Sequence, residues 1–336
     1  MEIHNGKVMG GVGSDPVANP GFAIAKWIDV LDDKVDTWAI AVDDLHDNTA
    51  FNTYDTGRVW VFAPSNTKAN IISALVAGQF VADVGNFGVT PGFPIRSGAG
   101  ISVTCPGAVR IEAWGPAGLL SATDADSHAH TFTGTETYVR LEAVGDYTEP
   151  FASLPHPWMA LDGSWGVSGG VLSLSSDGTA KHMILRRHRA GDFEAQVDVK
   201  LEDGGGFESA VLMFNVLTAN YWYGLRIGQS GSGDYNNRLT VFNTTDGGSS
   251  LSLLDFDALT VPMDTFYTVK MEYTASTGRI QAKAWERGQT EPGWLLDVTD
   301  TDWTWGGFGL RANYTPDFDN FYVKGWRTYY QPVTVT

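Results

Sequence analysis

Ten short, β-prone segments follow one another through the second half of the chain, and Gly, Asn, Asp or Pro separates each from the next. Within residues 192–201, apolar side chains at Phe193, Val197 and Leu201 alternate with polar ones, as in a strand with one buried and one solvated face. Ten such strands over about 160 residues predict an antiparallel sandwich of jelly-roll size. The segments are 170–175, 182–187, 192–201, 209–216, 221–228, 237–243, 266–274, 278–285, 306–312 and 318–326.

The first half of the chain also reads as mainly β, with five further segments that are β-branched or aromatic and bounded by turn residues. Residues 70–85 fit either a helix or two strands, because periodicity alone does not separate these alternatives. Residues 21–33 show weak helical spacing. The five strand segments are 37–42, 58–63, 100–105, 108–114 and 137–144.

Three prolines between residues 145 and 163 interrupt the strand pattern and predict a domain boundary near residue 150. The predicted fold class is therefore all-β, with two domains. We expect an extended N-terminal arm (1–21), a mainly β assembly or docking domain (22–148), a jelly-roll domain (149–329) and a C-terminal tail (330–336).

The charge and the distribution of apolar residues argue against nucleic acid and a membrane as partners. The chain has 22 Lys and Arg against 39 Asp and Glu, a formal net charge of −17, so nucleic acid would be repelled at long range. Because no stretch reaches 18 apolar residues, we expect no membrane insertion. The N-terminus shows no cleavable secretion signal. Cys105, the single cysteine, excludes an internal disulfide and predicts a buried thiol.

Residues 151–326 resemble the concanavalin A-like lectin/glucanase superfamily, particularly the laminin-G-like jelly rolls of phage minor tail proteins and secreted carbohydrate-active proteins. The stretches that carry the resemblance are "WGVSGGVLSLS", "GDFEAQVDVKL", "AKAWERGQTEPGW", "GGFGLRA" and "FDNFYVKGW". The resemblance implies a concanavalin A-like β-sandwich, and it implies little about function.

Enzymatic members of that superfamily present paired acids in a pattern close to E-x-D-x-x-E on one strand. Here Glu194, Asp198 and Glu202 follow one another at spacings of four and four, with Lys200 between the last two. We interpret these acids as the solvated face of a strand. The sequence thus predicts that the protein is not an enzyme.

Two metal sites are hypotheses that follow from the resemblance and from the spacing of two histidines. The resemblance implies a structural Ca²⁺ held by the carboxylate of Asp319 together with a backbone carbonyl of Gly191 or Asp192, since hard cations prefer oxygen ligands. A weaker candidate is the run with His128 and His130, whose alternation places both imidazoles on one face of a strand. An ordinary polar loop is the alternative there.

Residues 220–239 are the main candidate for contacts with a glycan. Sugars are held by aromatic faces and by amides or guanidinium groups that bond hydroxyls, and this segment offers both. The alternative is a packed strand followed by an ordinary hairpin. Trp285, with Trp294 nine positions later, is a further aromatic candidate or a core residue. The full candidate set is Tyr221, Trp222, Tyr223, Arg226, Tyr235, Asn236, Asn237 and Trp285.

Together these features predict a bacteriophage minor tail protein, located in the virion, whose lectin-like domain binds a host cell-wall glycan. Expected partners are other virion tail proteins and copies of the same chain. One alternative is an extracellular carbohydrate-active protein whose jelly roll is a binding module or a glycoside hydrolase. The other is a virion part with no ligand.

Overall fold

The computed structural model describes residues 2–5, 38, 40–42, 58–83, 89–152, 158–175, 180–190, 192–202, 208–229 and 237–335. Within these ranges the chain is built almost entirely from strands, and the predicted all-β fold class is confirmed. The helix among them is α2 (Lys68–Val76), which begins where the Thr67 hydroxyl accepts a hydrogen bond from the backbone of Asn70. No helix in the described ranges is long and apolar enough to cross a membrane.

Two large antiparallel sheets hold most of the strands. The larger sheet contains β3 (Arg58–Val61), β4 (Phe80–Asp83), β7 (Arg110–Gly115), β8 (Gly118–Thr123), β10 (Tyr138–Glu149), β12 (Ser164–Ser168), β13 (Val171–Ser175), β15 (Phe193–Lys200), β20 (Phe266–Thr274), β21 (Arg279–Glu286), β22 (Leu296–Thr299), β24 (Asp317–Tyr330) and β25 (Val333–Thr334). The seven-stranded sheet contains β11 (Trp158–Ala160), β14 (Lys181–Ala190), β16 (Glu208–Val216), β17 (Trp222–Gln229), β18 (Arg238–Thr244), β19 (Ser252–Ala258) and β23 (Trp305–Asn313).

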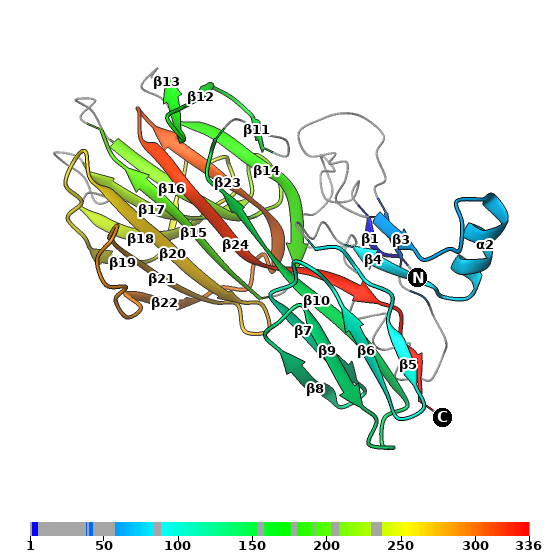
Figure 1. Ribbon diagram of the computed structural model, residues 1–336. Coiled ribbons are helices and arrows are strands. Elements are labelled where there is room, and N and C mark those ends of the chain that lie inside the picture. The colour runs from blue at the N-terminus through cyan, green and yellow to red at the C-terminus, as the bar shows by residue number, and fades with distance from the viewer. Residues whose placement is uncertain are drawn as a thin grey trace.

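Two small sheets complete the described strands. One consists of β5 (Ile95–Ser97), β6 (Gly100–Thr104) and β9 (Ser127–Thr131), which are antiparallel. The other is a parallel pair, β1 (Glu2–Asn5) and β2 (Ile40–Val42). Both belong to the N-terminal half of the chain (Figure 1).

The C-terminal half is a sandwich in which the seven-stranded sheet packs on β15, β20, β21 and β24 of the larger sheet (Figure 1). The predicted alternation explains the packing: Phe193, Val197 and Leu201 point into the core, while Glu194 and Lys200 remain outside it. Residues of β16, β17 and β23 supply the facing side of the same core. The buried apolar area between the two sheets therefore holds this half together.

The long strand β24 belongs to both halves of the molecule. Its first part pairs with β13 and β15, and its last part pairs with β10 and β4 (Figure 1). Tyr330, at its end, is fully buried in a second core with residues of β6, β7 and β10. Residues 330–336, interpreted from the sequence as a tail, include β25, which pairs with β10. The predicted boundary near residue 150 is thus bridged by the last long strand.

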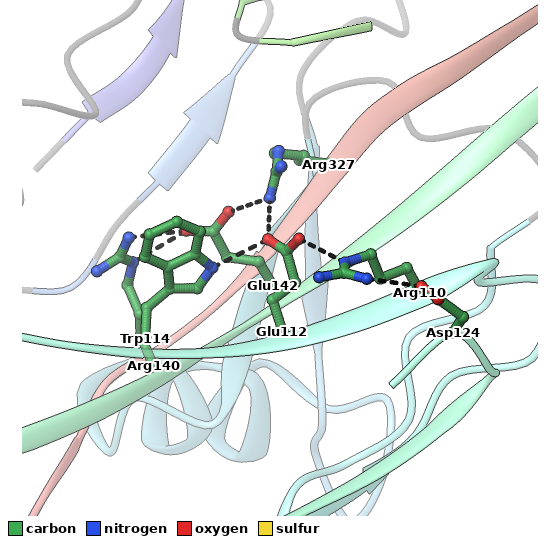
Figure 2. A network of polar contacts seen from close by, with 7 residues as sticks. All are labelled: Arg110, Glu112, Trp114, Asp124, Arg140, Glu142 and Arg327. Atoms are coloured by element: carbon green, nitrogen blue, oxygen red, sulfur yellow. Dashed lines mark hydrogen bonds and ion pairs between the residues drawn. The ribbon is translucent and has the colours of Figure 1, made fainter. Parts of the chain in front are cut away.

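A network of charged groups fastens β24 to the N-terminal half (Figure 2). Arg327 Nη1 donates to Glu112 Oε2 at 2.6 Å and to Glu142 Oε2 at 2.8 Å. Glu112 and Glu142 lie directly opposite each other on β7 and β10. Arg110 and Arg140 donate to the remaining carboxylate oxygens. Two like charges are therefore held side by side by three guanidinium groups.

Several local predictions can be compared with the structure. Residues 70–85 form neither a single helix nor two strands: the chain is helical through α2 and then enters β4. The stretch "GRIQAKAWERGQTEPGWLL" is a hairpin, with β21 paired to β22. Cys105 is fully buried, as expected for a lone thiol. The sequence-based interpretation omitted several strands, among them β8, β11 and β19. The predicted arm, apart from residues 2–5, and the helical segment 21–33 lie outside the described residues.

Candidate binding face

The seven-stranded sheet has one face in the sandwich core and a second, outer face that carries an unusual row of side chains. Side chains directly opposite each other on antiparallel strands share a face, so the strand register defines this row. It crosses β14, β23, β16, β17, β18 and β19 in turn. In that order its members, which we call the outer row, are His182, Arg311, Val211, Arg226, Thr240 and Phe256.

On one side of the outer row the face is apolar. Trp222, Met213 and Phe242 are almost fully buried there, beneath Met159, Leu161 and Leu251. Glycines on the facing strands make room for these large side chains: a Cβ at Gly224 would lie 2.5 Å from Phe242. This half of the outer face is packed protein interior.

On the other side of the outer row the face is polar. Ser209 and Asn313 lie opposite each other on β16 and β23 and form the next row along the strands. Five buried atoms of the outer row and of this next row have no hydrogen-bond partner within the described chain: His182 Nε2, Ser209 Oγ, Thr240 Oγ1, Arg311 Nε and Asn313 Oδ1. Buried polar atoms without partners are costly, and a cluster of them on one face indicates a site completed by water or a ligand.

The β19 end of the outer row is open to solvent. Phe256 is 44% exposed, and the guanidinium of Arg238 lies 4.1 Å from the centre of its ring. Asn237, just before β18, is exposed and adopts a positive φ of 52°. An exposed aromatic ring thus leads directly to the buried hydroxyl of Thr240.

The loop of residues 245–251, between β18 and β19, covers the opposite end of the outer row. Gly248 lies against both Trp222 and Arg311, since a Cβ there would be 3.1 Å from the first and 3.3 Å from the second. Asp246 Oδ1 holds the loop by accepting from the Thr244 hydroxyl and the backbone of Ser250. Arg311 Nη2 donates to the Gly248 carbonyl at 3.4 Å.

The structure separates the aromatic residues that the sequence brought together. Trp222 belongs to the buried apolar half of the outer face, and its indole donates to the carbonyl of Ala219. Tyr223 points to the other side and is fully buried in the sandwich core, where it stacks with Phe214. Tyr221 packs against that same core and Trp303. Surface contacts from Trp222 and Tyr223 are therefore contradicted by their burial, because neither ring is accessible.

The other candidate residues lie in three places. Arg226 is 2% exposed and lies in the middle of the outer row. Asn237 is exposed just before β18, where its backbone donates to the carbonyl of Gly228, while Tyr235 and Asn236 lie outside the described residues. Trp285 is half-buried on the larger sheet, away from the outer row, as is Trp294, whose ring lies 4.0 Å from Lys283 Nζ. Of the predicted set, Arg226 belongs to the candidate face, and Asn237 lies in the turn at the end of β17 and β18.

The predicted Ca²⁺ ligands are not brought together. Asp319 lies opposite Asp198 and accepts a hydrogen bond from Arg287 Nη1 at 2.8 Å. Asp192 precedes β15, at the other end of the β15–β24 ladder, and accepts from the backbone of Ala275. Gly191 lies outside the described residues. Asp192 and Asp319 therefore cannot ligate one ion in this arrangement.

His128 and His130 do share one face of β9, as the alternation predicts, and both imidazoles bond the hydroxyl of Ser121. His128 Nδ1 also contacts Thr123 Oγ1 at 2.8 Å, and His130 Nε2 contacts Glu136 Oε1 at 3.3 Å. Each ring nitrogen thus has a hydroxyl or carboxylate partner. Among the described residues no group of His, Cys, Asp and Glu fits a metal ion.

The three acids of the "FEAQVDVKLE" stretch lie on the outer side of the larger sheet, and each has its own partner. Glu194 pairs with Lys270 at 3.2 Å and Glu202 with Lys200 at 3.0 Å. Asp198 accepts from Thr268 and Asn320 and lies 3.5 Å from Arg287. Glu194 and Glu202 are partly exposed, but Asp198 is 4% exposed, so the interpretation as a solvated face is wrong for Asp198.

Sequence reasoning missed Thr240, Phe256, Arg311, Ser209 and Asn313 as site residues. Ser209, Thr240 and Arg311 are polar residues within predicted β-segments that otherwise read as buried, and Asn313 directly follows such a segment. Phe256 belongs to β19, which the sequence-based interpretation omitted. Register between strands that are far apart in sequence joins Arg311 to Val211 and Thr240 to Phe256. No spacing within a single segment indicates that juxtaposition.

No protein-family model matches the chain, and no curated protein matches it in sequence. Solved structures do resemble about half of the chain in outline. Carbohydrate-binding module CBM66 from Bacillus subtilis has a TM-score of 0.41 at 20% identity, over 49% of this chain and 92% of its own.

Basic winged bean lectin with Tn-antigen has a TM-score of 0.43 at 9% identity, over 57% of this chain and 100% of its own. The CBM2 module of the evolved Dit of Lactobacillus casei BL23 phage J-1 has a TM-score of 0.38 at 12% identity, over 55% of this chain and 97% of its own. At these identities and TM-scores nothing about the ligand of this chain follows from them.

Proposed function

We propose that this chain is a structural protein of a bacteriophage tail whose C-terminal sandwich binds a glycan on the host cell surface. The glycan-binding part of this proposal is supported by the outer row. It joins an exposed aromatic ring, Phe256, to polar groups that have no partner within the described chain. Sugars present both apolar C–H faces and hydroxyls, so such a surface is chemically suited to them.

The tail assignment rests on the sequence resemblance to laminin-G-like jelly rolls of phage minor tail proteins. The N-terminal half would dock on other tail proteins, and several copies of the chain would present several sandwiches at once. Weak single sites then gain strength from effective concentration. The protein would be part of the virion; an extracellular carbohydrate-active protein is the alternative.

A glycan array of bacterial cell-wall oligosaccharides, probed with the purified chain, tests the binding proposal. Phe256→Ala should weaken binding to the best ligand about 5- to 10-fold, the loss expected for one aromatic contact of about 1 to 1.5 kcal/mol. Phe266→Ala is a matched control, because Phe266 also carries an arginine on its ring, Arg287 at 3.9 Å, but belongs to the other sheet. Equal losses in the two variants, or no binding to any glycan, would refute the assignment.

Two further measurements separate the alternatives. Steady release of reducing sugar from a bound polysaccharide by the pure protein would identify a glycoside hydrolase instead of a binding module. Electron microscopy of phage particles with an antibody against this chain should show label on the tail. Unlabelled particles would refute the virion part of the proposal and leave the glycan site untouched.

A further inference from the structure

We propose that the Arg311 end of the outer row binds the negatively charged group of an acidic sugar. The inference rests on the proposed glycan-binding function and adds the class of glycan: one that carries a carboxylate or a phosphate group. Arg311, Ser209 and Asn313 would form this site.

The guanidinium of Arg311 is buried and has no directly bonded carboxylate; the charge of Asp162 acts on it only from a longer distance. The residue is 7% exposed, and it forms no ion pair among the described residues. Its polar contact is the long bond from Nη2 to the Gly248 carbonyl, while Nε has no acceptor. Burial lowers the pKa of Arg311 to about 10. A buried charge without a directly bonded counter-ion is costly, so a ligand that supplies a carboxylate or phosphate group in contact with it would bind favourably.

A buried and a partly buried arginine of this chain, Arg140 and Arg327, show how a structural guanidinium is paired. Arg140 is 3% exposed and lies 2.9 Å from the carboxylate of Glu142. Arg327 bonds two carboxylates at once. With 39 acidic and 22 basic residues, the chain has ample carboxylates to pair its cations. Among the described residues no carboxylate bonds Arg311 directly, and this sets the site apart from the structural ion pairs.

The neighbours of Arg311 are suited to the rest of a sugar ring. Asn313 lies two positions further along β23, so its side chain shares the face at about 7 Å along the strand. Ser209 lies opposite Asn313 on the adjacent strand. Ser209 Oγ and Asn313 Oδ1 both have unused hydrogen-bonding capacity and can bond hydroxyls. The planar guanidinium fork matches a carboxylate or phosphate group.

The 245–251 loop decides how a ligand reaches Arg311. Its anchors do not involve Arg311: Asp246 bonds Thr244 and Ser250, and the backbone of Gly247 bonds the carbonyl of Asn220. The bond from Arg311 to Gly248 is at the long end of the accepted range. An anion has to displace this single weak contact, and in return it provides charge-assisted hydrogen bonds.

Calorimetric titration with defined probes tests the inference. The probes are a galacturonic acid oligomer, its methyl ester, which is neutral, and a glycerol phosphate oligomer. We expect at least one anionic probe to bind roughly 10- to 100-fold more tightly than the neutral ester, the effect of one or two hydrogen bonds to a charged group. Which anion binds identifies whether the source is a uronic acid or a phosphate polymer.

Variants assign the effect to Arg311. Arg311→Gln should abolish the preference for the anion, and Arg311→Lys should retain part of it. Arg279→Gln is the control, because Arg279 is an exposed arginine on the other sheet that pairs with Asp297. If Arg311→Gln does not fold, the Arg311 Nε–H signal of the wild-type protein should shift with the acid and not with its ester.

Equal affinity for the acid and its ester overturns the inference and leaves neutral glycan binding intact. A preference that survives Arg311→Gln also overturns it, because the charge would then be recognised elsewhere. Absence of binding to all probes, together with a positive glycan array, excludes an anionic ligand and keeps the proposed function. A negative array rejects the proposed function itself.

Discussion

Arg327 and Glu112 are 215 positions apart in the chain, yet Arg327 Nη1 lies 2.6 Å from the Glu112 carboxylate. The contact joins the last long strand, β24, to β7 of the N-terminal half (Figure 2). Burial alone would raise the pKa of Glu112, but the charge and hydrogen bond of Arg327, with bonds from Arg110 and Trp114, hold it below its ordinary value. The two halves of the protein are therefore coupled by charge as well as by backbone pairing.

Replacing Arg327 by Leu should destabilise the protein strongly. The variant leaves the buried carboxylates of Glu112 and Glu142 opposite each other without Arg327. Removing one partner of a buried ion pair lowers the free energy of unfolding by roughly 3–5 kcal/mol. Urea unfolding followed by tryptophan fluorescence measures this loss. Arg279→Leu removes an exposed pair and should leave the unfolding midpoint unchanged. Similar midpoints for both variants would contradict a buried, energetically important network.

Replacing Gly248 by Ala should disturb the 245–251 loop. The residue has φ +88°, and its new Cβ would meet Trp222 at 3.1 Å, so conformational strain and crowding add together. Gly288→Ala is a close control, because Gly288 also has φ +88° but has no atom within 4 Å of the new Cβ. Hydrogen exchange of the loop amides should accelerate in Gly248→Ala beyond the change in Gly288→Ala. Identical exchange would show that the loop is not packed on the face.

Replacing Trp222 by Leu should reduce stability by roughly 2–4 kcal/mol, because the indole is completely buried among apolar side chains. A shift of the thermal midpoint by several degrees measures the loss. Weaker glycan binding by Trp222→Leu would therefore result from partial unfolding and not from the loss of a ligand contact. Trp285→Leu, at a half-buried position on the other sheet, should shift the midpoint much less. A Trp222→Leu protein as stable as wild type would contradict this burial.

The stability of the protein should fall as the pH drops below about 6.5. Burial, and second the charge of His130, lower the pKa of His128 in the folded protein. The unfolded chain then binds the proton more readily, so the contribution of His128 is present above pH 6.5 and is lost as the pH falls. His182, whose pKa is also lowered chiefly by burial, acts in the same direction. Urea midpoints from pH 8 to pH 5 test this.

A second loss is expected at lower pH. Burial by itself would raise the pKa of Glu136, but hydrogen bonds from the backbone and hydroxyl of Thr133 and from His130 lower it to about 2. Its contribution is present above pH 4.5 and disappears towards pH 2. His128→Gln should flatten the upper part of the profile and leave the lower part. A midpoint that rises on acidification would contradict both assignments.

Sequence alone determined the β-architecture of this protein. Alternation along residues 192–201 assigns Phe193 and Val197 to a core and Glu194 to the surface, because successive side chains of a strand point to opposite faces. The same period separates Trp222 from Tyr223, and the structure indeed buries them on opposite sides of one sheet. Such local rules need no knowledge of which strand lies next to which.

Tertiary structure decided what each face contains. Whether the outer side of a strand is wet depends on what covers it, so Trp222 could be identified as buried only once Leu251 and Leu161 were placed above it. The outer row exists because six strands, spread from residue 181 to residue 313, align in one register. Hydrogen bonding between strands sets that register, and it acts between residues whose distance along the chain carries no information about their distance in space.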